Sequence, residues 1–164
     1  IVFGDRWVKS APIEVPGHHT RVSIAGKIDT AAHFLDGSYG IVDFKTAEPK
    51  AAHVPFYSRQ LHCYALAAEH PLPGALSLAP VTKLGLLCVE PFGMVGDGDE
   101  VAMLCTSTYL DIPRDDEGFM AFLSQVLAIL ERNTPPESSP DCQFCRYVGT
   151  GAMHLVTSIY ETDL

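Results

Sequence analysis

The sequence has 164 residues and 47% hydrophobic content, which suits a single globular domain with a substantial core. It has no apolar run of about 18 residues, as a membrane-spanning helix requires, and it does not begin with a signal-peptide pattern. The net charge of −9 argues against non-specific electrostatic binding of nucleic acid by the chain as a whole.

Charge and cysteine are distributed unevenly along the chain. Residues 1–59 carry 7 Lys/Arg and 6 Asp/Glu, whereas residues 60–164 carry 4 and 14, so a polyanion is expected to approach the N-terminal part. The five cysteines are odd in number, and three lie in apolar runs. This pattern indicates thiols in a reducing, cytoplasmic setting rather than a disulfide framework.

The first predicted elements are strands. Residues 1–15 predict one or two short strands, and alternating apolar residues predict another from about 22 to 34. The segment "LDG" at 35–37 predicts a three-residue hairpin loop that Gly37 closes in a left-handed conformation, before a strand in "SYGIVDFKTA". Counting back from this loop, Asp29 lies opposite Asp43 and on the same face.

The remaining elements alternate between helices and strands. In chain order they are a helix over Val54–His70, strands over 82–93 and 100–113 separated by the turn-rich "GMVGDGD", an amphipathic helix over 115–133, and a loop over 134–151. This order predicts an α/β fold around a mixed sheet. We expect a core domain over residues 1–134 and a cysteine-containing loop or tail over 135–164.

Two acids and a lysine stand out in the predicted hairpin. Carboxylates at Asp29 and Asp43 on neighbouring strands suit Mg²⁺ or Mn²⁺, and Lys45 is placed to orient a water or stabilise developing charge. Gln60 and Tyr64 are four residues apart on the predicted helix, so they share a face and can hydrogen-bond the lysine or a phosphate. A purely structural ion pair between Asp43 and Lys45 is the alternative.

Three segments carry a resemblance when they are taken in order. "GKID" at 26–29, "GIVDFKTA" at 40–47 and "YSRQLHCYALA" at 57–67 together resemble the PD-(D/E)XK nuclease superfamily. Within it they are most similar to the RecB-like branch, which includes the CRISPR-associated exonucleases. The resemblance implies a restriction-endonuclease-like α/β core, with a mixed β-sheet flanked by helices.

The resemblance also implies roles for individual residues. Asp29 and Asp43 would be metal ligands, the backbone carbonyl of Phe44 a third ligand, and Lys45 the catalytic lysine. The implied cofactor is Mg²⁺ or Mn²⁺, and the implied partner is DNA.

The helix motif is expected to support this site. By the same resemblance, Gln60 and Tyr64 support the site and contact the DNA backbone, and Tyr57 joins them as a substrate-binding or supporting residue. The isolated histidines His33, His53 and His62 are interpreted as surface or supporting residues rather than as metal ligands.

The sequence departs from the family pattern in two places. No upstream helix with an acidic residue or histidine precedes Asp29, and we expect a fragment that lacks this element. Cys142 and Cys145 match the first part of an iron–sulfur motif, but no further cysteine follows them, so a complete cluster is not expected in this chain. The pair is interpreted as an iron–sulfur or zinc remnant, with a redox or simple structural pair as alternatives.

Three functional hypotheses follow. The first is a metal-dependent deoxyribonuclease, exonuclease-like on single strands or ends, acting in repair, recombination or CRISPR- or phage-related processing. The second is a catalytically inactive member of the same fold that binds DNA or scaffolds a complex with a helicase or another subunit. The third is an unrelated α/β protein whose acids and lysine form a structural network.

Overall fold

The structure is a computed structural model that describes residues 2–46, 48, 54–97 and 100–150. The chain divides into two compact units, Ile1–Ala128 and Ile129–Leu164. In the described residues, no helix has the length and apolar character needed to cross a membrane.

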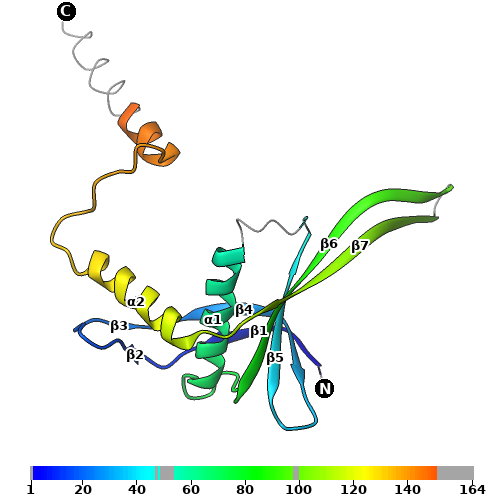
Figure 1. The fold of residues 1–164 in the computed structure, drawn as a ribbon, viewed down its shortest axis with the longest axis horizontal. Coiled ribbons are helices and arrows are strands. Elements are labelled where there is room, and N and C mark those ends of the chain that lie inside the picture. Colours follow the sequence, from blue (N-terminus) through cyan, green and yellow to red (C-terminus); the bar gives the residue numbers. More distant parts are fainter. Residues whose placement is uncertain (1, 47, 49–53, 98–99, 151–164) are drawn as a thin grey trace, which may run out of the picture. The chain divides into compact units, whose positions relative to one another are not determined.

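The first unit is built around a five-stranded sheet with the strand order β1-β4-β5-β6-β7, beside a separate two-stranded pair, β2-β3 (Figure 1). The elements are β1 (Val2–Lys9), β2 (Ile13–Glu14), β3 (Arg21–Val22), β4 (Ala25–His33), β5 (Tyr39–Lys45), α1 (Val54–Glu69), β6 (Val81–Asp97), β7 (Glu100–Ile112) and α2 (Asp116–Leu130).

The sheet is mixed, as the order of elements predicts. The neighbouring strands β5 and β6 are parallel, whereas β1-β4, β4-β5 and β6-β7 are antiparallel. Parallel neighbours need a long crossover connection, and α1 lies in the connection between β5 and β6. This crossover places α1 against the sheet, directly after the strand that carries Asp43.

The main core lies between α1 and one face of the sheet. On β6, the buried side chains Leu84, Leu86 and Cys88 are two residues apart, so all three point toward the same side. They pack with Leu61 and Ala65 of α1 in one apolar cluster. The face of β6 that carries these residues is therefore the face covered by α1.

A smaller core lies under the second helix. Phe119, Leu123 and Leu127 are four residues apart on α2, and they pack with Val15 in a second apolar cluster that also includes Leu66 of α1. These contacts attach α2 to α1 and to the region of the β2-β3 pair.

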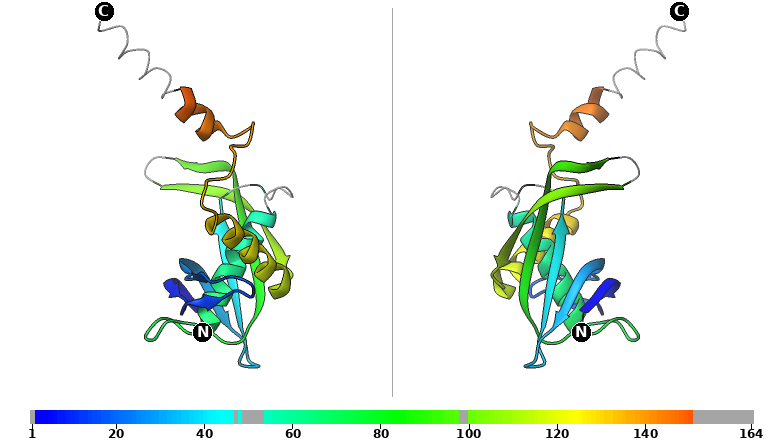
Figure 2. Two further views of the ribbon diagram at one scale, coloured as in Figure 1. Left: turned by 90° about the vertical axis from the view of Figure 1, so that its left-hand side faces the viewer. Right: turned by 90° about the vertical axis from the view of Figure 1, so that its right-hand side faces the viewer.

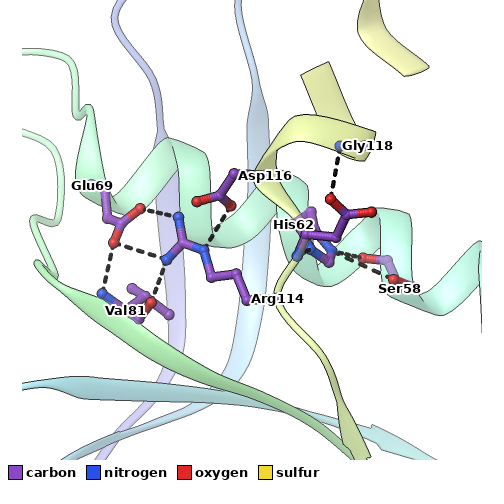
Figure 3. A network of polar contacts seen from close by, with 8 residues as sticks. Ser58, His62, Glu69, Val81, Arg114, Asp116 and Gly118 are labelled. Carbon is purple, nitrogen blue, oxygen red and sulfur yellow. Dashed lines mark hydrogen bonds and ion pairs between the residues drawn. The ribbon is translucent and has the colours of Figure 1, made fainter. Parts of the chain in front are cut away.

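A buried histidine joins the beginning of α2 to α1 (Figure 3). His62 is 4% exposed, its Nδ1 lies 2.7 Å from the carbonyl oxygen of Ser58, and its Nε2 accepts the backbone N–H of Asp115 at 2.8 Å. The acceptor role of Nε2 assigns the proton to Nδ1, which then donates to Ser58. Of the two predicted alternatives, a surface or a supporting residue, the burial of His62 favours the supporting one. His53 lies outside the described residues.

An arginine ties the other end of α1 to the sheet and to α2 (Figure 3). The Arg114 guanidinium donates to both carboxylate oxygens of Glu69 and to the backbone carbonyl of Val81, and its Nε lies 2.7 Å from an oxygen of Asp116. These acceptors raise the pKa of Arg114 further above its already high value, chiefly through the hydrogen bond with Glu69. The arginine remains charged and holds three elements together.

Three sequence predictions differ from the observed elements. The strand predicted over 22–34 is divided into β3 and β4. The turn predicted at 93–99 is strand as far as Asp97, because β6 continues to pair with β7 through Met94↔Met103 and Asp97↔Glu100. In the second unit, residues 143–150 form a helix within the segment predicted as a loop.

Candidate active site

The β4-β5 hairpin places the two predicted acidic ligands beside each other. Gly37 has φ of 86°, the left-handed conformation predicted for the loop, and Phe34 N–H donates to the carbonyl of Ser38 at 2.8 Å. The register runs His33↔Tyr39 through Thr30↔Val42. Continued by one residue on each strand, this register brings Asp29 opposite Asp43, so the predicted register is confirmed.

Asp43 is a buried carboxylate whose two oxygens have different partners. It is 2% exposed, and its Oδ1 accepts a hydrogen bond of 3.2 Å from Gln60 Nε2. Its Oδ2 forms an ion pair with the ammonium of Lys45. A buried carboxylate is costly unless positive groups and donors meet it, so this site favours cations.

The electrostatics of Asp43 reflect the same arrangement. Burial raises the pKa of its carboxyl above the usual range, and the neighbouring charge of Asp29 raises it further, while Lys45 acts in the opposite direction. Asp29 itself is exposed, and its Oδ2 accepts the backbone N–H of Phe44 at 2.8 Å. This bond holds the Asp29 side chain across the end of β5, next to Asp43.

Lys45 lies at the centre of the polar cluster. Its ammonium is paired with Asp43, lies 3.4 Å from Gln60 Oε1, and is 4.8 Å from the centre of the Tyr57 ring. The ring face attracts the cation, and the two oxygens restrict where it can lie. Asp43 and Lys45 therefore share one face of β5, as their spacing of two residues predicts.

The helix motif meets the acids through Gln60. Gln60 and Tyr64 are one turn apart on α1, and Gln60 Nε2 donates to Tyr64 Oη at 2.7 Å as well as to Asp43. The amide thus donates to an acid and a phenol while accepting from Lys45. The predicted orientation of Gln60 and Tyr64 toward Lys45 is confirmed.

Sequence reasoning did not assign a role to Gly26, the first residue of "GKID". A β-carbon at this position would lie 2.5 Å from Tyr64 Cε1, closer than two such carbons can approach. An isolated glycine within a strand is a signal for such a close approach. The glycine on β4 therefore makes room for the tyrosine of α1.

The described residues contain no group of three or more His, Cys, Asp or Glu side chains arranged to hold a metal ion. The cluster instead offers two carboxylates, at Asp29 and Asp43. Mg²⁺ is commonly bound through one or two carboxylates while it keeps several waters. The buried carboxylate of Asp43, the neighbouring carboxylate of Asp29 and the all-oxygen donor set fit such a hard cation.

The two C-terminal cysteines belong to the second unit. All five cysteines of the chain are free, and Cys142 Sγ accepts the backbone N–H of Cys145 at 3.4 Å, at the beginning of the 143–150 helix. This hydrogen bond lowers the pKa of Cys142, while interaction with Cys142 raises the pKa of Cys145. Their interpretation as a metal-site remnant stays a prediction.

We compared the chain with models of protein families, with curated proteins and with solved structures. The model of the PD-(D/E)XK nuclease superfamily matches residues 3–150, and no curated protein matches the chain. One similar solved structure is described as "Crystal structure of SSO0001"; it has 18% sequence identity and a TM-score of 0.48, and the match covers 88% of this chain. The chain spans 57% of the length of that protein.

The family match includes the segments that form the cluster of acids, lysine and glutamine, together with the mixed sheet and helices that carry it. The predicted restriction-endonuclease-like α/β core is confirmed. The chain belongs to the PD-(D/E)XK nuclease superfamily.

Proposed function

We propose that this domain is a metal-dependent deoxyribonuclease that hydrolyses phosphodiester bonds with Asp29, Asp43 and Lys45. We further propose that it acts on single strands or ends in the manner of an exonuclease. The observation that carries the proposal is the buried carboxylate of Asp43, which lies beside the Asp29 carboxylate and the Lys45 ammonium. Two neighbouring carboxylates, one of them buried, repel each other, and a bound cation relieves this repulsion.

The residues that would hold Mg²⁺ or Mn²⁺ are Asp29 and Asp43, with the backbone carbonyl of Phe44 as the third oxygen donor. When bound, such an ion lowers the pKa of a coordinated water and shields the charge of the phosphate. Asp29 is already oriented by the N–H of Phe44, and Asp43 by Gln60, so both carboxylates are held before the ion binds.

Lys45 supplies a positive charge that cannot ligate the metal. Its ammonium is limited to a small region by Asp43, the Gln60 amide oxygen and the Tyr57 ring. A cation fixed beside a phosphate stabilises the negative charge that develops in the transition state, without reorganising at the moment of reaction. In the proposed mechanism Gln60 and Tyr57 are positioning residues, because they act on substrate through Lys45 and Asp43.

A cleavage assay tests the proposal. End-labelled single-stranded and double-stranded DNA, and an RNA of the same sequence, are incubated with the protein in Mn²⁺, in Mg²⁺ and in EDTA. We expect DNA cleavage that needs the metal, proceeds from ends, and is absent in the Asp43→Ala variant. The Asp111→Ala variant, which removes an exposed acid on β7, is the matched control and should cleave normally.

A second candidate function is supported by a specific observation. The described residues supply two carboxylates rather than three or more metal-ligating side chains, and one of the two is already paired with Lys45. A non-catalytic member of the fold, which binds DNA or scaffolds a helicase complex, would need no more carboxylates than these two. Binding of the single-stranded oligonucleotide without cleavage in either metal would favour it over the nuclease.

A further inference from the structure

The hairpin formed by β6 and β7 extends beyond the rest of the sheet. The last pair that joins β5 to β6 is Lys45↔Cys88, whereas β6 continues to Asp97 and stays paired with β7. Figures 1 and 2 show this two-stranded ribbon leaving the sheet. No described side chain of the ribbon, over 89–96 and 100–109, is buried.

One face of the ribbon collects large apolar side chains. Met94 pairs directly with Met103, and side chains that are directly opposite, or two residues apart on one strand, share a face. Val101 and Cys105 therefore lie on the face of Met103. We call Met94, Val101, Met103 and Cys105 the ribbon apolar face; Met94 is 72% exposed, Met103 61% and Val101 57%.

A shift in strand register assembles this face. Between Pro91 and Gly93 the pairing slips by one residue, so Phe92 is an extra residue on β6. If the pairing before Pro91 continued without this shift, Met94 would pair with Ala102 and lie on the face opposite to Met103. The bulge thus directs apolar side chains of both strands to one side, away from the face that α1 covers.

The ribbon is short of stabilising contacts on its own. A two-stranded hairpin is marginally stable in water unless a further layer covers it, and contiguous exposed apolar side chains mark interaction surfaces. The opposite face offers less apolar surface, because its directly paired residues are Val95↔Ala102 and Gly93↔Leu104. We therefore expect the molecule that covers the hairpin to bind on the ribbon apolar face.

Charge identifies the kind of molecule that can cover it. From residue 84 to residue 113 the sequence has five acidic residues and no lysine or arginine. Such a surface repels nucleic-acid phosphates, and it also disfavours the juxtaposition of two ribbons from two copies of the chain. It is complementary to an apolar surface bordered by basic side chains.

We propose that the ribbon apolar face is a docking site for a partner protein whose binding surface is apolar and bordered by lysine or arginine. Met94 and Met103 supply the central contacts, since large exposed side chains of this kind dominate interface cores. Glu90 and Glu100 lie on the opposite face of the ribbon, and their negative charge attracts the basic border of the partner from there. This proposal does not depend on the chemistry at Asp43, because the ribbon lies beyond the last β5-β6 pair.

The test uses a synthetic amphipathic helical peptide of leucine and lysine, with a leucine–glutamate peptide of the same length as its counterpart. Titration should show binding of the basic peptide and none of the acidic one. The variant Met94→Glu/Met103→Lys places an ion pair across the ribbon without changing net charge, and it should weaken binding by at least about tenfold. The matched variant Val95→Glu/Ala102→Lys, one residue along on the opposite face, should bind like the unaltered protein.

A second measurement needs no variant. Cys105 lies on the ribbon apolar face and is exposed, so bound peptide should slow its alkylation by iodoacetamide, while exposed Cys145 of the second unit reacts at an unchanged rate. Equal binding by both double variants, or unprotected Cys105, would overturn the proposal. Two further outcomes would also overturn it. One is a dimer that the Met94→Glu/Met103→Lys variant converts to monomer, and the other is binding of single-stranded DNA that this variant abolishes.

Discussion

Gly26 of β4 lies directly against the ring of Tyr64 on α1. A β-carbon on Gly26 would stand 2.5 Å from Tyr64 Cε1 and 3.1 Å from Cδ1. The hydroxyl of the same tyrosine accepts a hydrogen bond from Gln60, which in turn donates to Asp43. A glycine on the strand next to that of Asp43 thus influences how the Asp43 carboxylate is held.

Gly26→Ala is expected to reduce nuclease activity by displacing the Tyr64 ring and weakening its bond to Gln60. The loss should be about tenfold in kcat, because an amide that orients a ligand acts indirectly. Cleavage rates and far-ultraviolet circular dichroism together check the prediction. Gly93→Ala is the control on β6, because its β-carbon would meet only Leu104 Cδ1, at an ordinary contact distance of 3.8 Å.

A double-mutant cycle separates this effect from general damage to the strand. In a Tyr64→Leu background the added methyl has less to displace, so Gly26→Ala should cost much less activity there. Equal losses in the two backgrounds would contradict the coupling of Gly26 to Tyr64.

The hairpin register could be predicted from sequence because its determinants are local. Gly37 closes a loop of fixed length, and side-chain alternation then carries the register back to Asp29. The orientation of Gln60 and Tyr64 was predictable for a similar reason, since residues one turn apart share a helix face.

Features set by tertiary contacts were not predictable. The glycine-rich "GMVGDGD" has the composition of a turn, but most of it is strand because β7 supplies partners as far as Glu100. His62 looks like an ordinary polar residue of a helix, and its burial depends on Asp115, which follows it by 53 residues. The sequence of each segment alone does not show which distant residues it will contact.

His62→Ala should destabilise the first unit by about 2 kcal/mol. The change leaves the Asp115 N–H without its buried acceptor and removes the ring that stacks on Phe119 at 5.6 Å. Urea denaturation followed by circular dichroism measures the loss. Ser58→Ala is the control, because it removes only the long contact of 3.5 Å between Ser58 Oγ and His62 Nδ1 and retains the backbone carbonyl that lies 2.7 Å from Nδ1. A His62→Ala protein as stable as this control would show that the histidine does not anchor α2.

Asp43→Asn is expected to stabilise the metal-free protein while abolishing activity. The substitution keeps an acceptor for Gln60, removes a buried negative charge beside Asp29, and leaves the size of the side chain unchanged. The gain should be about 1 kcal/mol at pH 8 in EDTA, the scale of relieving one poorly satisfied buried polar group. Thermal unfolding in EDTA tests this, with Asp111→Asn as an exposed control. A clear loss of stability would mean that the pair with Lys45 outweighs the burial of Asp43.

The last prediction separates the metal ligand from the lysine. Asp43→Ala should abolish both Mn²⁺ binding and cleavage, because it removes a proposed ligand. Lys45→Ala should leave Mn²⁺ binding intact or slightly stronger, since an ammonium repels a cation and cannot ligate it. Its cleavage rate should nevertheless fall by about 10²–10³, the loss found on removing one preorganised charge-stabilising group.

Paired measurements make this separation visible. Mn²⁺ titration monitored by electron paramagnetic resonance should distinguish Asp43→Ala from Lys45→Ala, although the two variants look alike in the cleavage assay. Lys83→Ala removes an exposed lysine of β6 and should match the unaltered protein in both measurements. Cleavage by Lys45→Ala at the unaltered rate would assign this ammonium to the fold rather than to the reaction. The pair between Asp43 and Lys45 would then be a structural ion pair, the alternative that their spacing on one strand leaves open.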